Sequence, residues 1–431
     1  MIANPPFGSP NFRVVAKGLI ELHRLIKQGL EESQEAEDIR DSLDAPLDAM
    51  SPTEKERAQW LSEDLYSISE PTADLPLALM EPRAQLDFLE AMESRHRGDW
   101  DRALAFLRRL NTHTTQSLLS HFRGVIWQAA GYPEVAAEFY RHATTLEPEN
   151  TAHLVLLLHC LSLSDATEAA ALAKGIVDHR LSNDPAVVVQ AIGILLPRGK
   201  HASDAETMES SRTWIPLLEE NLIRLMSKLT QVEAAEEMAY RQAYSMTAGT
   251  LAFCHELVDD IPAALNHYTL ALEQSPDDAD LLSARGRLLY GKDPQSVVDL
   301  GEAVNLNAKV VWPYLFLAHH YLAIGKFEHC RLMCEAGLNK RASDAIKSLL
   351  EVCRAIAQAE LGFSPEAVRA AFEEAIRWDP SNKLARENRE IYEAHLRKLG
   401  NSPAAIWHRW PESDLRQLSL KESRFAFHFA T

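Results

Sequence analysis

The sequence predicts an all-α protein built as an array of helical hairpins, and three observations carry this prediction. Apolar residues recur at the i, i+3, i+4 spacing of an amphipathic helix through most of the 431 residues. Small residues recur at matched offsets in successive segments of about 34 residues, where the two helices of a hairpin must touch. Prolines also stand at the expected start of several second helices, at Pro133, Pro262, Pro294 and Pro365.

The N-terminal region is predicted to be helical without being a repeat. Apolar residues follow helical spacing through 11–30, and a second, acidic helix is expected over 33–43. A third helix starts at Ser51, where a hydroxyl at the N-cap and the Glu54 carboxylate three residues on form a capping box. Residues 69–82 contain three prolines and are predicted to be a linker. The region either caps the array or forms a separate module.

The hairpin pattern is clearest in residues 117–150. Gly124 in the first helix and Ala136 in the second are small where the helices must approach, and Trp127 and Tyr140 fill the space beside them. The turn and the end of the unit are marked by Gly131, Pro133 and Pro148. This spacing resembles the tetratricopeptide repeat, a helix–turn–helix of about 34 residues. Six other segments fit the same register: 84–116, 151–184, 245–278, 279–310, 311–344 and 349–382.

The resemblance implies an α-solenoid, a right-handed superhelix of tetratricopeptide-like hairpins with an N-terminal helical segment. The predicted organisation is an acidic N-terminal segment and linker (1–82), a first sub-array (83–197), an irregular extended repeat or insertion (198–244), a second sub-array with a C-terminal capping helix (245–400) and an aromatic tail (401–431). The insertion is either a hinge or a passive addition.

Composition excludes several classes of protein. The net charge is −18, and residues 31–81 hold 15 acids against three bases, which disfavours binding to nucleic acid. No apolar run is long enough to span a bilayer, and the N-terminus has no secretion signal. Five cysteines in so long a chain do not form a disulfide framework. A cytoplasmic protein without membrane insertion is therefore expected. The acidic run is either a solvated helical face or a docking surface for a basic partner.

Motifs for catalysis are not found. The sequence has no glycine-rich phosphate loop, no H-E-x-x-H, no G-x-S-x-G and no EF-hand loop. Cys330 and Cys334 lie one helical turn apart and could share a metal ion with His319 or His320. Both cysteines also occupy positions where the repeat needs small core residues, and cysteine packs as a small hydrophobe. We therefore expect a protein that is not an enzyme and that holds no metal and no cofactor.

The resemblance also implies a binding surface, because in this family particular positions of each first helix line the concave groove. Carried onto this sequence, those positions give a peptide-binding groove of mixed aromatic, Met, His and Arg character. Its residues are Phe88, Met92, Arg95, His121, Val125, Gln128, His159, Phe253, Trp312 and His319, with Val155, Ser162, Glu256 and Leu315 beside them.

The function expected from these features is that of a scaffold or adaptor, which binds an extended or helical peptide segment of a partner protein in the groove. One alternative is an autoinhibited switch, in which the aromatic tail from Trp407 to Phe429 occupies the groove of its own chain. Another is a metal-dependent enzyme or regulator at Cys330 and Cys334. The partner's identity and the oligomeric state stay open.

Overall fold

The computed structural model describes residues 7–68, 81–111, 113–178, 181–182, 184–196, 204–231, 234–397, 407–409, 411, 414–415 and 418. These residues form helices α1 to α20 and no strand, so the all-α prediction is confirmed. The chain divides into two compact units, Met1–Leu195 (unit 1) and Leu196–Thr431 (unit 2), each considered by itself. None of the helices in these ranges combines the length and the apolar character needed to cross a bilayer.

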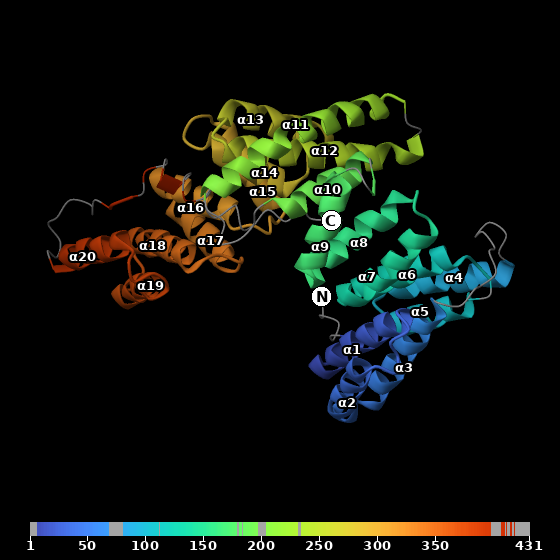
Figure 1. The fold of residues 1–431 in the computed structure, drawn as a ribbon. Helices are drawn as coiled ribbons and strands as arrows, with labels where there is room; N and C mark the ends of the chain where they lie inside the picture. Colours follow the sequence, from blue (N-terminus) through green and yellow to red (C-terminus); the bar gives the residue numbers. More distant parts are fainter. Residues whose placement is uncertain are drawn as a thin grey trace. The chain divides into compact units, whose positions relative to one another are not determined.

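Three helices open unit 1 (Figure 1), and each starts at a serine cap. They are α1 (Pro10–Lys27), α2 (Gln34–Ala49) and α3 (Pro52–Ser67), capped by the Ser9, Ser33 and Ser51 side chains. The predicted capping box is present, because the Ser51 backbone N–H donates to Glu54 at 3.0 Å. The Ser9 N–H donates to the same carboxylate at 2.7 Å, which joins the start of α1 to that of α3. Hydrogen bonds from Ser9, and then from Ser51, lower the pKa of Glu54 to about 2.

These three helices pack on the hairpins that follow. The Phe12 ring stacks on Trp127, with ring centroids 6.4 Å apart. Asp64 accepts hydrogen bonds from Arg108 at 3.0 and 2.9 Å, and Arg123 lies 3.2 Å from the same carboxylate. Asp64 is 2% exposed and Arg123 is fully buried. An aromatic stack and a buried ion pair therefore join the N-terminal helices to the hairpins that follow.

The hairpins of unit 1 follow the predicted register. They are α4 (Pro82–His96) with α5 (Trp100–Arg109), α6 (Gln116–Ala129) with α7 (Pro133–Leu146), and α8 (Thr151–Ser164) with α9 (Ala166–Val177), followed by α10 (Pro185–Leu195). α6 and α7 touch at Gly124, where an added Cβ would lie 2.7 Å from the Tyr140 ring. The turn between them needs Gly131, whose φ is +88°.

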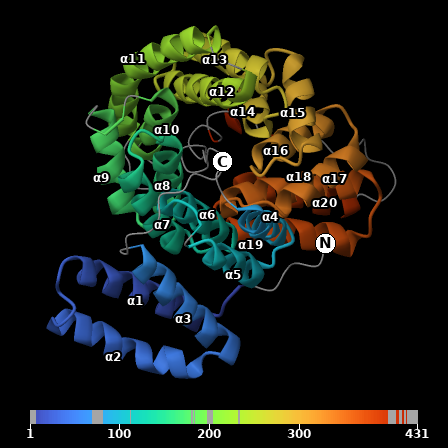
Figure 2. The same ribbon diagram turned by 90° about the vertical axis from the view of Figure 1, so that its right-hand side faces the viewer.

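Unit 2 is a second succession of helices, each packed on the next (Figure 2). They are α11 (Asp204–Leu229), α12 (Ala234–Leu257), α13 (Ile261–Gln274), α14 (Ala279–Leu289), α15 (Gln295–Asn305), α16 (Trp312–Ala323), α17 (Phe327–Leu338), α18 (Asp344–Glu360), α19 (Pro365–Trp378) and α20 (Lys383–Arg397). α12 runs unbroken through residues 244 and 245, where the predicted insertion meets the second sub-array. Neither proline nor glycine interrupts the chain there, so this predicted boundary falls inside one helix.

The beginning of the predicted tail is packed on the last helices of unit 2. The Trp407 indole N–H donates to Glu360 at 2.6 Å, and the ring stacks on Tyr392. The buried Asn388 side chain accepts the His408 N–H at 2.8 Å and donates to its carbonyl oxygen at 2.9 Å. Trp407 is therefore partly buried against the core of unit 2. The linker residues 69–80 and the tail residues Trp410, Phe425, Phe427 and Phe429 lie outside the described residues.

Candidate functional site

A row of aromatic and histidine side chains crosses the first helices of the three hairpins of unit 1; it is half-buried on α4 and α6 and buried at His153 on α8. Phe88 on α4 packs edge-on against Phe122 on α6, with ring centroids 4.7 Å apart. His121 lies beside Phe122 with centroids 5.0 Å apart, and its Nδ1 is 3.2 Å from Nδ1 of His153 on α8. The contacts therefore continue from α4 through α6 to α8. We call this row, with the other predicted groove residues of these helices, the α4–α6–α8 strip.

The remaining predicted residues of unit 1 lie on the same three helices. Six of them are half-buried: Met92, Arg95, Val125, Gln128, Val155 and His159. The seventh, Ser162 on α8, is exposed. Gln128 is fixed, because the hydroxyl of the buried Tyr140 donates to its side-chain oxygen at 3.0 Å. The sequence prediction missed Phe122 and His153, which complete the row. The sequence offered one indication of each: Phe122 directly follows His121, and His153 lies in the first turn of α8.

The His121 and His159 side chains of the strip are neutral at pH 7. Burial, and then the neighbouring His153, lower the pKa of His121 to about 4. Burial also lowers the pKa of His159. The Glu147 carboxylate at the end of α7 lies 3.3 Å from Nε2 of His153. Arg95 is thus the one permanent cation among the predicted groove residues of unit 1.

Ser117, His153 and Glu147 are the residue types of a hydrolytic triad, but their geometry is different. Ser117 Oγ lies 3.4 Å from Nε2 of His153, and Glu147 Oε2 lies 3.3 Å from the same nitrogen. A triad needs the nucleophile on one ring nitrogen and the carboxylate on the other. The other nitrogen of His153 faces His121, and Ser117 is only 4% exposed. This cluster therefore does not form a hydrolytic triad; its polar contacts hold His153 in place beside His121.

The predicted groove residues of unit 2 are placed differently. Phe253, Trp312 and His319 are buried, with exposed fractions of 6%, 4% and 5%. The Tyr290 hydroxyl lies 2.8 Å from Nδ1 of His319. Glu256 is 1% exposed, pairs with the buried Arg287 and accepts the Tyr268 hydroxyl at 3.2 Å. The structure therefore does not bring these positions together as an open surface like that of the strip.

The cysteines considered as metal ligands are core residues. Cys330, Cys334 and Cys353 are fully buried, and the Cys330 thiol donates to the Cys353 carbonyl oxygen at 3.7 Å. Burial raises the pKa of Cys334 well above its usual value, which disfavours the thiolate that a metal ion binds. Within the described ranges, no three His, Cys, Asp or Glu side chains lie close enough together to hold a metal ion.

Comparisons with known proteins give likeness of structure only. No protein-family model and no curated protein matches the chain. Among solved structures, yeast Tom70 is similar at 11% identity and a TM-score of 0.30, covering 79% of this chain and 77% of Tom70. A tetratricopeptide repeat protein from Parabacteroides merdae has 12% identity, a TM-score of 0.34 and coverages of 68% and 98%. The tetratricopeptide domain of P58(IPK) has 16% identity, a TM-score of 0.22 and coverages of 81% and 79%.

Proposed function

We propose that the protein is a protein-interaction scaffold, and that unit 1 binds an extended or helical peptide segment of a partner along the α4–α6–α8 strip. The observation that carries the proposal is the row of half-buried side chains Phe88, Phe122 and His121, which contacts the buried His153. These side chains are held by contacts with one another and still reach solvent. A partner that covers them therefore gains apolar burial without first ordering the site.

The chemistry of the strip suits a peptide with a few apolar anchors. Phe88, Met92 and Phe122 offer adaptable apolar area, and the neutral His121 can donate or accept a hydrogen bond. Aromatic and methionine side chains supply most of the binding energy in such interfaces. Arg95 adds a single cation on α4, which favours a peptide with a hydrogen-bond acceptor or an acidic side chain at the α4 end of the strip.

The proposal includes an adaptor role in the cytoplasm without enzymatic activity or cofactor. In support, the five cysteines are free and buried, as expected for a reducing compartment. The triad-like cluster at Ser117 lacks the geometry for acyl transfer. Protein or peptide partners follow from the character of the strip.

Selection of a random peptide library on the full chain tests the proposal. Selected peptides should bind the wild-type protein, and Phe88→Ala and Met92→Ala should each weaken binding roughly tenfold, as buried interface anchors do. Lys174→Ala, an exposed change on α9, is the matched control and should leave affinity unchanged. Peptides that bind Phe88→Ala and Met92→Ala as tightly as wild type would overturn the proposal.

A truncated chain distinguishes an open scaffold from the autoinhibited switch. The truncation should remove residues 419–431 only, because Trp407 and the buried Leu415 support the last helices. In an open scaffold, the truncated and full-length proteins bind a selected peptide equally. Tighter binding by the truncated protein would identify the switch.

A further inference from the structure

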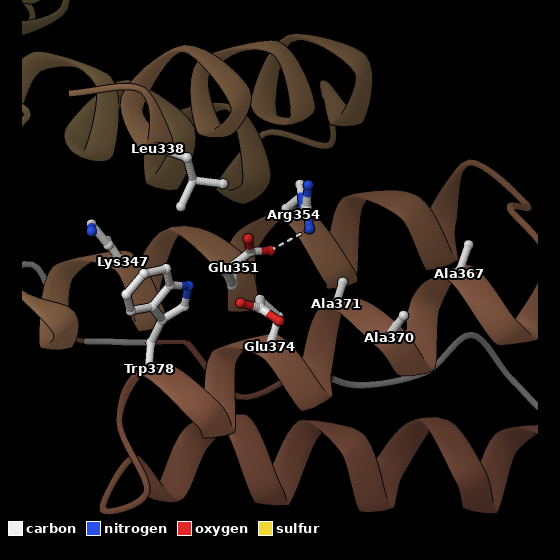
Figure 3. Close-up of a pocket in the computed structure, with 9 residues that line it drawn as sticks. All are labelled: Leu338, Lys347, Glu351, Arg354, Ala367, Ala370, Ala371, Glu374 and Trp378. Atoms are coloured by element: carbon white, nitrogen blue, oxygen red, sulfur yellow. Dashed lines mark ion pairs between the residues drawn. The ribbon is translucent and has the colours of Figure 1, made fainter.

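A depression of about 420 Å³ lies in unit 2, where the end of α17 meets α18 and α19 (Figure 3). The charged side chains that line it already have partners. Arg354 lies 2.7 Å from Glu351, and the Lys347 ammonium lies 4.1 Å from the centroid of the Trp378 ring. The charges of this depression therefore give no reason to expect a particular ligand, and the α4–α6–α8 strip of unit 1 differs from it in this respect.

The His121 ring on α6, the middle helix of the strip, is held by its neighbours. Its centroid lies 5.0 Å from that of Phe122, 6.0 Å from that of Tyr140 and 5.1 Å from that of His153. Its Nδ1 faces Nδ1 of His153 at 3.2 Å. Its Nε2 forms no hydrogen bond with the residues that the structure describes, and this nitrogen is open to solvent. Nε2 of His121 is therefore available to a bound peptide.

The Glu147 carboxylate at the end of α7 decides where the protons lie in this cluster. Burial raises its pKa, but hydrogen bonds from Asn150, Ser117 and His153 outweigh burial, and the pKa is below its ordinary value. Glu147 is therefore ionised at pH 7 and can only accept hydrogen bonds. Its Oε2 lies 3.3 Å from Nε2 of His153, so this nitrogen of His153 carries a proton.

The tautomer of His121 follows from that of His153. A neutral imidazole carries one proton, so a neutral His153 that donates from Nε2 has only a lone pair on Nδ1. The facing Nδ1 of His121 must then donate across the 3.2 Å contact. Because His121 is neutral at pH 7, its one proton is used there, and its Nε2 has only a lone pair. The contacts from Glu147 through His153 thus make Nε2 of His121 a hydrogen-bond acceptor.

We propose, on the basis of the proposed peptide binding along the strip, that His121 determines specificity by accepting a hydrogen bond from the peptide at Nε2. The peptide group that fits is an uncharged donor, which is a backbone N–H, a side-chain amide or a hydroxyl. A peptide oxygen without a proton at this point would face the lone pair of Nε2 and be rejected. Glu147 and His153 are positioning residues, which act through the tautomer of His121. With Arg95 on α4, the strip thus favours an acceptor near α4 and a donor at α6.

Nitrogen NMR of the full chain with isotope-labelled histidine tests the tautomer without any ligand. The His121 signals are assigned with His121→Phe, at about pH 8, which is above the ordinary histidine pKa of about 6.5. The expected spectrum shows His121 with its proton on Nδ1 and a bare Nε2, and His153 with its proton on Nε2. A proton on Nε2 of His121 would overturn the proposal.

Glu147→Ala tests whether the carboxylate sets this tautomer. Without the carboxylate, the Ser117 hydroxyl, 3.4 Å from Nε2 of His153, can donate to that nitrogen, so His121 should populate both tautomers. Glu149→Ala removes an exposed acid two residues further on, and as the matched control it should leave the His121 signals unchanged. His121 signals in Glu147→Ala that equal those of wild type would contradict the positioning role of Glu147.

A double-mutant cycle with a library-selected peptide tests the contact itself. Each backbone N–H of the peptide is replaced in turn by an ester oxygen, and each side-chain donor by an apolar group. One replacement should weaken binding to the wild-type chain roughly threefold to tenfold, as the loss of one neutral hydrogen bond does, and should have no effect on binding to His121→Phe. If no donor couples to His121 while Phe88→Ala still weakens binding, the role of His121 is refuted and the scaffold function is not. If Phe88→Ala and Met92→Ala bind the peptide as wild type does, the strip itself is refuted.

Discussion

Helices α6 and α7 approach each other closely at Gly124, and replacing this residue by alanine tests the packing of this hairpin directly. The new Cβ would lie 2.7, 2.8 and 2.9 Å from three atoms of the Tyr140 ring. Carbon atoms in van der Waals contact are about 3.5–4.0 Å apart. Tyr140 is fully buried and its hydroxyl is bound to Gln128, so the ring cannot swing away without losing that bond.

The expected net effect is destabilisation of about 1–2 kcal/mol. Overpacking of this kind costs about 1–3 kcal/mol, and alanine regains up to about 1 kcal/mol of helix propensity over glycine. Gly301→Ala on α15 is the matched control, because no atom lies within 4 Å of its added Cβ. There only the propensity gain remains, and the change should stabilise its helix by about 0.5–1 kcal/mol.

Native-state hydrogen exchange of the full chain measures both effects, since repeat arrays open locally and do not unfold as one unit. Gly124→Ala should accelerate exchange in α6 and α7, whereas Gly301→Ala should slow it in α15. Protection of α6 and α7 equal to or above wild type in Gly124→Ala would refute the packing argument. Gly124→Leu adds further atoms at the same contact and should be at least as destabilising.

Two further predictions concern the packing of the N-terminal helices on the hairpins of unit 1. Burial holds His23 and His142 neutral with pKa values of about 4, so the unfolded chain takes up protons first and unit 1 loses stability as the pH falls from about 6.5 towards 4. This loss of stability is at most about 1.4 kcal/mol per pH unit for each histidine, and it should be smaller in His23→Leu. A pH profile of hydrogen exchange in unit 1 that stays flat would contradict this prediction. Asp64→Asn leaves the buried Arg123 without its counter-charge and should cost about 3–5 kcal/mol, whereas Arg97→Ala at an exposed pair should cost under about 0.5 kcal/mol. If hydrogen exchange in α3 and α6 were equally slow in Asp64→Asn and in Arg97→Ala, the predicted stabilisation by the buried ion pair would be contradicted.

Helix starts could be predicted from the sequence because their signals are local. The capping box at Ser51 and the prolines Pro133, Pro262 and Pro365 depend only on backbone geometry within one turn, and all stand where expected. Pro294 precedes α15 by one residue, a shift within the usual uncertainty of helix ends.

Burial in the assembled unit could not be predicted, since it depends on residues distant in sequence. The register places His319 on a first helix, but nothing local shows that Tyr290, 29 residues away in sequence, packs against it. The anchoring of Trp407 depends on Glu360, 47 residues away. For the same reason the N-terminal helices could be predicted, but not their docking on the hairpins.

The most direct test of the proposed function is hydroxyl-radical footprinting of the full chain with and without a selected peptide. Met92, Phe88 and His121 are half-buried and chemically reactive, and bound peptide should reduce their oxidation. Met226 and Met238 in unit 2 are 57% and 80% exposed and serve as internal controls whose oxidation should not change. Protection at Met92 with unchanged Met226 and Met238 would support the strip as the binding surface. Unchanged oxidation of Met92 under saturating peptide would contradict it.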